Sequence, residues 1–237
     1  MQAIILAGGK ATRLPESAKD IPKALVHVGG KPILAHQIDQ LQQHGFFDIR
    51  LARGYKAEQI ISYVAGVKLQ HNQHSIDWVI EREPLDTGGA IKLAARGLRE
   101  PFLVLNGDIL SDVHIENFAK KFSRNAKMEN AMVVAHLPDA RSYGMIKKRG
   151  TKVLEFLEKP VLPISGYVNV GFYILSPHIF KNIEEKKFSI EKNVFPTLAA
   201  QGKLGYYIHR GFWTDAGTEE RLLAAKLRFE PDITKIT

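Results

Sequence analysis

The first half of the chain alternates short apolar runs with segments in which apolar residues recur at helical spacing. The apolar runs have the length of β-strands and end in glycine or polar turn residues. They predict strands over residues 3–6, 49–52, 76–80 and 102–105. The segments between them predict helices over residues 32–45, 57–64 and 90–98, the first of which opens at Pro32 and stops at Gly45. Strands that alternate with helices in this order form right-handed βαβ units, so we expect a mainly parallel sheet.

Strand-like runs predominate after Asp108. They predict strands over residues 131–136, 153–157, 168–175 and 204–208, with helices over residues 115–122, 177–182 and 218–229. Because no Ser/Gly-rich linker, low-complexity tract or repeat separates the halves, we expect one domain over residues 1–228 and a tail over residues 229–237. The expected fold is α/β, a Rossmann-like mixed, mainly parallel sheet flanked by helices. Ligands of such sheets bind at the carboxyl ends of the strands.

The charge of the chain favours an anionic partner. The formal net charge is +8, in a composition that is 45% hydrophobic and 24% charged. The basic residues lie in short runs, at 120–121, 147–149 and 186–187, which is typical of a solvated face. A nucleic-acid partner would need a concentrated basic surface with interleaved aromatic residues, which the sequence does not show. The charge alone therefore does not choose between a phosphorylated substrate and an anionic surface, and a nucleic acid is disfavoured.

The chain has no cysteine, which excludes disulfides and thiolate metal sites. Among the nine histidines, the only pair with close spacing is His71 and His74, which we interpret as surface residues of a polar loop. The first residues show no basic region followed by a long apolar stretch, and no apolar window has transmembrane length, so we expect neither a secretory leader nor a membrane span. We therefore expect a cytoplasmic protein without a membrane partner, and homo-oligomerisation is left open.

The loop after the first strand, LAGGKATRLPESAKDIPKAL, has the residues of a polyphosphate-binding loop. Gly8 and Gly9 allow backbone N–H groups to approach a phosphate, and Arg13 and Lys23 supply cations. The loop matches neither GxxxxGK[ST] nor GxGxxG. A tight turn with two surface cations would explain the glycines alone, but it would not explain Arg13 together with Pro22-Lys23.

This loop resembles the signature of the sugar-1-phosphate nucleotidyltransferases, Gly-Gly-x-Gly-Thr-Arg-Leu followed by Pro-Lys. The matching residues are Gly8, Gly9, Thr12, Arg13, Leu14, Pro22 and Lys23. Ala11 departs from the pattern, where the family usually has glycine. Later segments resemble the family's motifs in order and spacing, at residues 81–90, 106–108, 156–160, 169–171, 189–192 and 213–218. The resemblance covers nearly the whole chain and implies a glycosyltransferase-A-like nucleotidyltransferase fold.

The resemblance implies a role for each matching residue. The residues implied to bind the nucleotide are Leu6, Ala7, Gly8, Gly9, Thr12, Arg13, Lys23, Glu81, Thr87, Gly88 and Asp108. The residues implied to bind the sugar phosphate are Asn106, Tyr143, Gly144, Glu158, Lys159, Asn169 and Gly171. Asp108 and Asp215 are implied to hold Mg²⁺, and the residues implied to be catalytic are Arg13, Lys23, Asp108 and Lys159. Residues 1–110 would form the nucleotide-binding part and residues 111–228 the sugar-phosphate-binding part.

The implied reaction joins a nucleoside triphosphate and a sugar 1-phosphate into a nucleotide-sugar and releases pyrophosphate. Both reactants are anions, so catalysis should consist of charge neutralisation and in-line positioning. Two carboxylates and phosphate oxygens are sufficient ligands for Mg²⁺. Arg13 and Lys23 would contact the triphosphate and Lys159 the attacking phosphate. The nucleophile is already ionised, so no general base is needed.

The base and the sugar are less strongly indicated. Glu81 and Glu83 are hydrogen-bond acceptors, which suits the N1–H and 2-amino donors of guanine. The segments 1–87 and 189–192 resemble the heptose-1-phosphate and mannose-1-phosphate guanylyltransferase branches, so we expect GTP and a manno-configured sugar phosphate. The alternatives are uridylyl or thymidylyl transfer to N-acetylmuramic acid 1-phosphate or glucose 1-phosphate.

Simpler interpretations exist for the single residues and for the whole chain. Asp108 alone is typical of a turn after a strand, and Lys159 of an edge strand. Asn169 within an apolar run should have a hydrogen-bond partner, because an unpaired buried amide is costly. A non-catalytic regulatory homologue that binds a nucleotide-sugar is the alternative of another class, and the presence of Arg13 and Asp215 argues against it.

Overall fold

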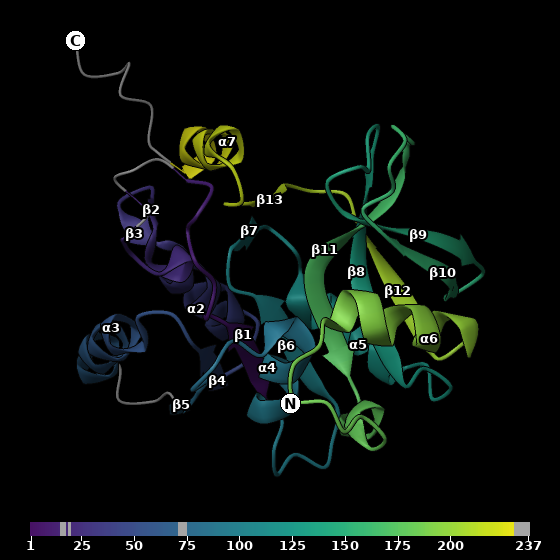
Figure 1. The fold of residues 1–237 in the computed structure, drawn as a ribbon, viewed down its shortest axis with the longest axis horizontal. Coiled ribbons are helices and arrows are strands. Elements are labelled where there is room, and N and C mark those ends of the chain that lie inside the picture. Colours follow the sequence, from purple (N-terminus) through teal and green to yellow (C-terminus); the bar gives the residue numbers. More distant parts are fainter. Residues whose placement is uncertain (15–17, 19, 71–74, 230–237) are drawn as a thin grey trace.

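The computed structural model describes residues 1–14, 18, 20–70 and 75–229, and in these ranges the chain builds a mixed nine-stranded sheet (Figure 1). The first half of the sheet consists of four parallel strands in the order β5 (Ser75–Ile80), β4 (Asp48–Arg53), β1 (Ala3–Leu6) and β6 (Phe102–Asn106). The four strands expected in this half are confirmed to within two residues at each end. The loop expected to carry His71 and His74 lies outside the described residues.

The second half of the sheet is mostly antiparallel. It continues from β6 through β11 (Gly166–Leu175), β8 (Asn130–Leu137), β12 (Leu204–His209), β10 (Lys152–Glu158) and β9 (Gly144–Arg149). Only β8 and β12 pair in parallel among these described strands. The expectation of a mixed sheet is confirmed, but its mainly parallel character is restricted to the first half. For β9 and β10 the physical reason is their short connection at Gly150, which forms a hairpin and leaves no room for a crossover helix.

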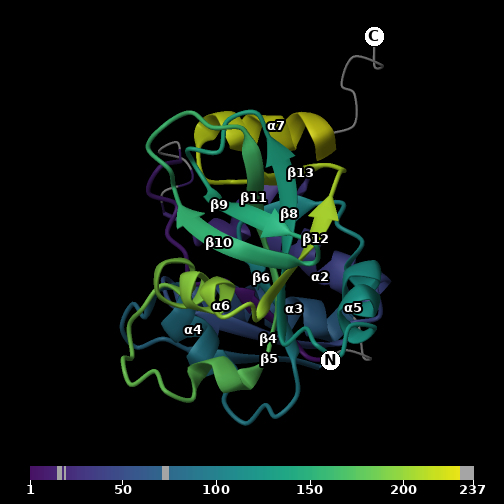
Figure 2. The same cartoon turned by 90° about the vertical axis from the view of Figure 1, so that its right-hand side faces the viewer.

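Helices cover both faces of the sheet (Figure 2). One face packs against α2 (Ile33–Gln43), α3 (Ala57–Gln70) and α5 (Ile115–Ser123), and the other against α4 (Asp86–Ala94) and α6 (Phe195–Ala200). Alternation along β1 explains the two cores, because Ala3 and Ile5 belong to the first and Ile4 to the second. The two apolar faces make a three-layer α/β/α arrangement.

Two small ribbons and the last helix lie beside the sheet. β7 (Ile109–Ser111) pairs with β13 (Trp213–Asp215), and β2 (His27–Val28) pairs with β3 (Lys31–Pro32). Helix α7 (Glu219–Phe229) contacts both ribbons. Together they bury a third apolar cluster that includes Ala11 and Leu14 of the first loop. The expected tail over residues 229–237 begins inside α7 at Phe229, and residues 230–237 lie outside the described ranges.

Several expected helices differ from those observed. Helix α4 starts at Asp86 and not at residue 90, because Gly88 and Gly89 pack closely against Phe188 and Lys186, and this packing overrides their low helix propensity. The helix expected over residues 177–182 is a short 3₁₀ turn, η2 (Pro177–Phe180), and α3 extends beyond residue 64. The turn η3 (Ile190–Val194), helix α6 and the small ribbons were not expected. No helix in the described ranges is long and apolar enough to cross a membrane.

Candidate active site

A cavity of about 570 Å³ lies where the parallel strands of the first half end. The β1, β4 and β6 strands end in register, since Leu6 is opposite both Ala52 and Asn106. The segments that follow them bring the glycine loop, Gly54-Tyr55 and Gly107-Asp108 to one edge of the sheet. This is the edge where the sheet topology predicts a ligand.

The surroundings of the three glycines at this edge explain in different ways why each position lacks a side chain. A Cβ on Gly107 would lie 2.3 Å from the backbone oxygen of Leu6, so the close approach of β1 and β6 requires glycine there. A Cβ on Gly8 would lie 2.9 Å from Oε1 of Glu81. At Gly9 the nearest atom to such a Cβ is 3.9 Å away, so packing within the described protein does not require glycine. The missing side chain of Gly9 leaves space for a ligand to approach the backbone.

Lys23 and Asp108 form an ion pair in the lining of this cavity. Lys23 opens the short turn η1 (Lys23–Leu25), and its backbone N–H donates to the Gly9 oxygen over 3.2 Å. Both side chains are mostly buried, with exposed fractions of 12% for Lys23 and 28% for Asp108. The ion pair therefore neutralises two charges that the cavity would otherwise hold in a partly desolvated state.

A second cavity, of about 860 Å³, adjoins the first. The two share the lining residues Asp86, Thr87, Asn106 and Asp108. Segments from both halves of the chain line the second cavity, including the β9–β10 hairpin, the 187–193 segment and the start of α7. Asp108 therefore faces two adjacent compartments.

The β7–β13 ribbon places Asp215 beside Asp108. Asp215 is opposite Ile109 in the ribbon, and the Ala216 N–H donates to the Asp108 backbone oxygen over 2.9 Å. The Asp215 carboxylate accepts hydrogen bonds from the Gly217 N–H at 2.7 Å and from Arg221 Nη1 at 2.8 Å. In the described chain each of the two carboxylates is thus paired with a cation, Lys23 or Arg221.

Aromatic rings enclose the Asp215–Arg221 pair. The Arg221 guanidinium lies 4.5 Å from the ring centre of Tyr143, and Trp213 packs edge-on against the same ring at 5.1 Å. Burial of the Tyr143 hydroxyl, followed by the negative charge of Asp215, raises the pKa of Tyr143 far above its ordinary value. Tyr143 therefore acts in this site as a neutral hydrogen-bonding group and an apolar wall.

Tyr173 holds two asparagines of the second cavity. Its hydroxyl accepts hydrogen bonds from Asn169 Nδ2 at 2.8 Å and from Asn106 Nδ2 at 3.4 Å. The Asn169 Oδ1 accepts from the Gly171 N–H at 2.9 Å, so the amide expected to have a partner has two. The pairing of β11 with β8 shifts register between residues 169 and 173, where Gly171 has a φ of +89°. This irregularity is typical of sites where a strand presents a side chain to a ligand.

Two acidic residues, Glu158 and Glu191, line the second cavity. Glu191 accepts hydrogen bonds from Thr87 Oγ1 at 2.5 Å and from Ser189 Oγ at 2.8 Å, which ties α4 to η3. Burial, and then the negative charge of Glu191, raises the pKa of Glu158, although Lys159 and Lys192 oppose this shift. Burial likewise raises the pKa of Glu81 in the first cavity, where its carboxylate accepts the Leu85 N–H over 3.2 Å.

Two cavity residues have left-handed backbone conformations without being glycine. Asp86 has a φ of +56° and Lys159 a φ of +50°. For Lys159 the conformation is doubly unfavourable, because Pro160 follows it. A hydrogen bond from the Lys159 N–H to the Tyr143 oxygen, at 3.2 Å, helps to hold this conformation. Strain of this kind clusters at functional sites, where surrounding contacts maintain it.

The structure brings most of the expected site residues together. Among those expected to bind the nucleotide, the residues that line the first cavity are Leu6, Gly8, Gly9, Lys23, Glu81, Thr87 and Asp108. All the residues expected to bind the sugar phosphate line the second cavity, and so does Asp215. Arg13 lines the second cavity and not the first. Ala7, Thr12 and Gly88 line neither; Ala7 is buried in the core, and Gly88 packs on Phe188.

Some cavity residues were not expected from the sequence. They include Tyr55 in the first cavity and Arg141 and Arg221 in the second. Glu191 and Lys192, which also line the second cavity, belong to the segment 189–192 that resembles a family motif. Tyr55 directly follows the glycine after β4, so its place at a strand end was a usable signal. Arg221 belongs to an exposed amphipathic helix, and no local pattern separates it from the other charged residues there.

Comparison with known proteins shows what the chain is similar to. A family model described as "Nucleotidyl transferase" matches residues 2–231. The chain is 34% identical over 241 aligned residues to a mannose-1-phosphate guanyltransferase of Emericella nidulans, an alignment that covers 99% of this chain and 66% of that protein. The corresponding protein of Yarrowia lipolytica is 35% identical, with the same coverage. The chain thus spans slightly less than two thirds of the length of these relatives.

A solved structure with high similarity is that of HddC from Yersinia pseudotuberculosis complexed with GMP-PN. It has 31% sequence identity and a TM-score of 0.82, and the alignment covers 97% of this chain and 99% of that chain. A second structure of HddC has a TM-score of 0.81 and 30% identity. The similarity covers both halves of the sheet and therefore both cavities.

Proposed function

The chain belongs to the nucleotidyl transferase family, and from this premise we propose that it transfers a nucleotidyl group from a nucleoside triphosphate to a sugar 1-phosphate. The observation that carries the proposal is the position of Asp108, which lines both of two adjacent cavities. One cavity has the glycine loop and Lys23, which suit a triphosphate, and the other has Lys159 and hydrogen-bonding amides, which suit a sugar phosphate. The products are a nucleotide-sugar and pyrophosphate.

The reaction requires two anions to approach each other in line. An oxygen of the sugar phosphate attacks the α-phosphorus, a bond from that phosphorus to oxygen forms, and the bond to the leaving pyrophosphate breaks. Lys159 extends from the strained turn after β10 and would bind the attacking phosphate. The Gly8 and Gly9 backbone and Lys23 would hold the triphosphate. Arg13 lines the second cavity, so we assign it to the region where the two substrates meet.

The residues around Asp108 fit a divalent cation of the Mg²⁺ type. Asp108 and Asp215 offer hard carboxylate oxygens, both line the second cavity, and the β7–β13 ribbon holds them together. Mg²⁺ would neutralise charge on the phosphates of both substrates. Asp108 and Asp215 would hold this ion.

The ion pair of Lys23 with Asp108 suggests how the site prepares for the triphosphate. The Lys23 ammonium has three N–H donors, so its pairing with Asp108 leaves donors that would bind a phosphate oxygen of the triphosphate. Arg221, which is paired with Asp215, likewise has further N–H donors that would face a bound anion in the second cavity.

Guanine is the base that the first cavity favours. Glu81 presents a half-buried carboxylate at the cavity wall, and one of its oxygens accepts the Leu85 N–H. The other oxygen is available for the N1–H or 2-amino donors of guanine. Uracil and thymine offer N3–H alone, so a carboxylate gains less from them. GTP is therefore the proposed donor, and UTP and dTTP are the alternatives.

A manno-configured sugar is the proposed acceptor, either mannose 1-phosphate or D-glycero-α-D-manno-heptose 1-phosphate. The sugar would lie between the amide of Asn169 and the carboxylates of Glu158 and Glu191, which can orient several hydroxyl groups. The similarity to mannose-1-phosphate guanyltransferases supports this choice. Glucose 1-phosphate and N-acetylmuramic acid 1-phosphate are the competing acceptors.

Pyrophosphate release across a matrix of substrates tests the proposal. GTP, UTP, dTTP, CTP and ATP are each combined with the four sugar phosphates, with Mg²⁺ present and then removed by chelation. Release with GTP and a manno-configured acceptor, absent in Asp108→Ala, is the expected result. Release with UTP or dTTP would refute the role of Glu81 and keep the reaction.

A non-catalytic sensor of nucleotide-sugars is the second candidate. It predicts binding of a nucleotide-sugar without pyrophosphate release from any substrate pair. The presence of Lys23, Asp108, Lys159 and Asp215 in the adjoining cavities favours catalysis over this alternative.

A further inference from the structure

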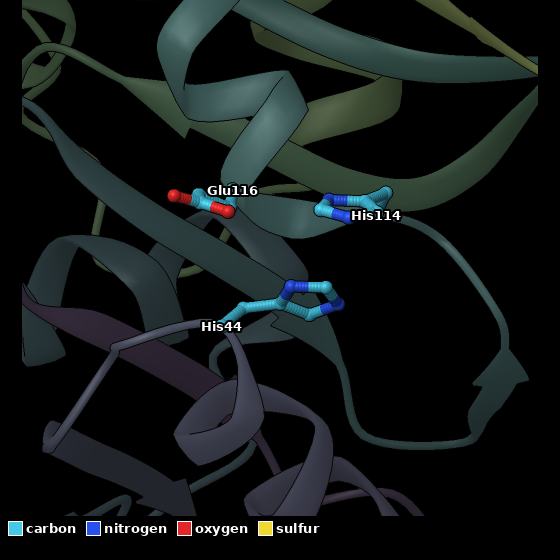
Figure 3. Close-up of side chains that lie close together, drawn as sticks. All are labelled: His44, His114 and Glu116. Carbon is cyan, nitrogen blue, oxygen red and sulfur yellow. The ribbon is translucent and has the colours of Figure 1, made fainter.

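Outside the two cavities, three metal-ligating side chains come together between the end of α2 and the start of α5 (Figure 3). His44 is the C-cap residue of α2, His114 is the N-cap residue of α5, and Glu116 lies in the first turn of α5. The two imidazole rings have centroids 4.5 Å apart and are tilted by 49°. His44 and His114 are far apart in the sequence, so spacing along the chain did not reveal them.

The geometry is close to that of a metal centre. One ring nitrogen from each histidine and one carboxylate oxygen of Glu116 lie within 4.8 Å of one another. Ligands of a tetrahedral ion with bonds of about 2.0–2.2 Å lie about 3.4 Å apart, so the ligand atoms must approach one another by up to about 1.4 Å. His114 is exposed and the other two are half-buried, so side-chain rotation alone can supply that movement.

We propose that His44, His114 and Glu116 form a binding site for a late first-row divalent cation such as Zn²⁺, with water completing the coordination. Two imidazole nitrogens with one carboxylate oxygen form a ligand set that suits Zn²⁺, whereas Mg²⁺ prefers oxygen ligands alone. This centre is therefore chemically distinct from the all-oxygen pair Asp108 and Asp215. It does not depend on the proposed function.

The neighbouring charges are compatible with an ion. Burial, followed by the charge of His114, lowers the pKa of His44, although Glu116 opposes the shift; this direction favours the neutral imidazole that binds a metal ion. Lys120 pairs with Oε1 of Glu116 at 2.5 Å, and about half of each side chain is exposed to solvent. Such a pair contributes little stability, so it competes weakly with a metal ion.

The position of the site explains what an ion would do there. Gln37 on α2 donates to the backbone oxygens of Asn106 and Ile109 at 2.8 and 3.0 Å, and Gln40 donates to Val113 at 2.9 Å. With His44, these residues follow one face of α2 at helical spacing. An ion bound by His44 and α5 would add a third tie between α2 and the segment that carries Asp108. The ion would therefore stabilise the fold.

Zinc binding to the untagged, metal-free chain tests the site directly. Equilibrium dialysis with elemental analysis is performed in excess Mg²⁺, which occupies the oxygen ligands of the catalytic site. The expected result is one Zn²⁺ per chain and a rise in thermal midpoint of roughly 5 °C at saturation. The variant His44→Gln/His114→Asn should bind at least about 10-fold more weakly, since loss of an outer partner alone costs about that much. Asparagine at position 114 keeps a good N-cap residue, so α5 is retained.

Three further variants establish that the zinc ion binds at this cluster and not elsewhere on the chain. His178→Asn removes an exposed histidine of η2 far from the cluster in sequence and should bind Zn²⁺ like the wild-type chain. Asp108→Asn should also bind like the wild type, because the ion does not depend on the catalytic carboxylate. Glu116→Gln preserves side-chain size and should weaken binding without unfolding the protein. The proposal is overturned if the wild type binds no Zn²⁺, if the histidine double variant binds equally tightly, or if Asp108→Asn loses the ion.

Discussion

Replacing Tyr173 with phenylalanine tests the hydrogen-bond network that positions Asn169. Tyr173 is fully buried, and its hydroxyl accepts the Asn169 amide at 2.8 Å and the Asn106 amide at 3.4 Å. A net hydrogen bond contributes about 0.5–1.5 kcal/mol, and an amide left buried costs about 1–3 kcal/mol. The 3.4 Å contact is weak, and both asparagines border the cavity, where water can reach them. We therefore expect Tyr173→Phe to lower the free energy of unfolding by about 1–2 kcal/mol.

The functional effect of this change should be asymmetric. Asn169 lines only the second cavity, so the KM for the sugar phosphate should rise several-fold while the KM for the nucleotide stays unchanged. Urea unfolding and steady-state pyrophosphate release measure the two quantities. Tyr206→Phe is the matched control, because its hydroxyl donates to the Gly150 oxygen at an exposed site where water replaces it. An equal loss of stability in both variants, or equal changes in both KM values, would refute the reasoning.

Three other substitutions have defined outcomes. Gly107→Ala should destabilise the fold by at least about 2 kcal/mol, because its Cβ would lie 2.3 Å from the Leu6 oxygen; wild-type stability in chemical unfolding would contradict this. Lys159→Gly should raise the thermal midpoint, because the φ of +50° at Lys159 is strained for a residue with a side chain. The same variant should bind the sugar phosphate more weakly. A lower thermal midpoint would contradict the strain. Glu158→Gln should be more stable than the wild type at pH 8. Folding raises the pKa of Glu158, so its ionised form destabilises the native state above that pKa. The difference in stability between the variant and the wild type should therefore vanish below about pH 4.5. A stability difference that grows at acid pH would contradict this reasoning.

The parallel half of the fold was accessible from the sequence because its signals are local. Apolar runs followed by glycine define the strands of β1, β4 and β6, and parallel topology then places their ends at one edge. Gly8, Lys23 and Asp108 were therefore expected near one another, and they line the same cavity. The antiparallel half was harder to predict, because the order of β8 to β12 in the sheet depends on long-range pairing that no short stretch of sequence encodes.

The residues that sequence reasoning missed depend on tertiary contacts. Arg221 becomes a site residue only because α7 packs beside the ribbon that holds Asp215. The left-handed conformation of Asp86 is invisible in the sequence, since neighbouring contacts impose it on a residue that is not glycine. His44 and His114 meet only because two helix ends converge. Ala11 looked like a departure from a phosphate loop, yet it is buried in the cluster beneath α7.

The central claim is that chemistry occurs at the α-phosphorus of the nucleotide. The most direct measurement uses GTP labelled with ³²P, at the α position in one reaction and at the γ position in another, with mannose 1-phosphate and Mg²⁺. The account predicts that the α label moves into a nucleotide-sugar and the γ label into pyrophosphate, in equal amounts, and that neither moves in Asp108→Ala. Three results would contradict this reaction. The γ label could move to the sugar, it could be released as inorganic phosphate, or no label could move from GTP or from the other four nucleotides with any of the sugar phosphates.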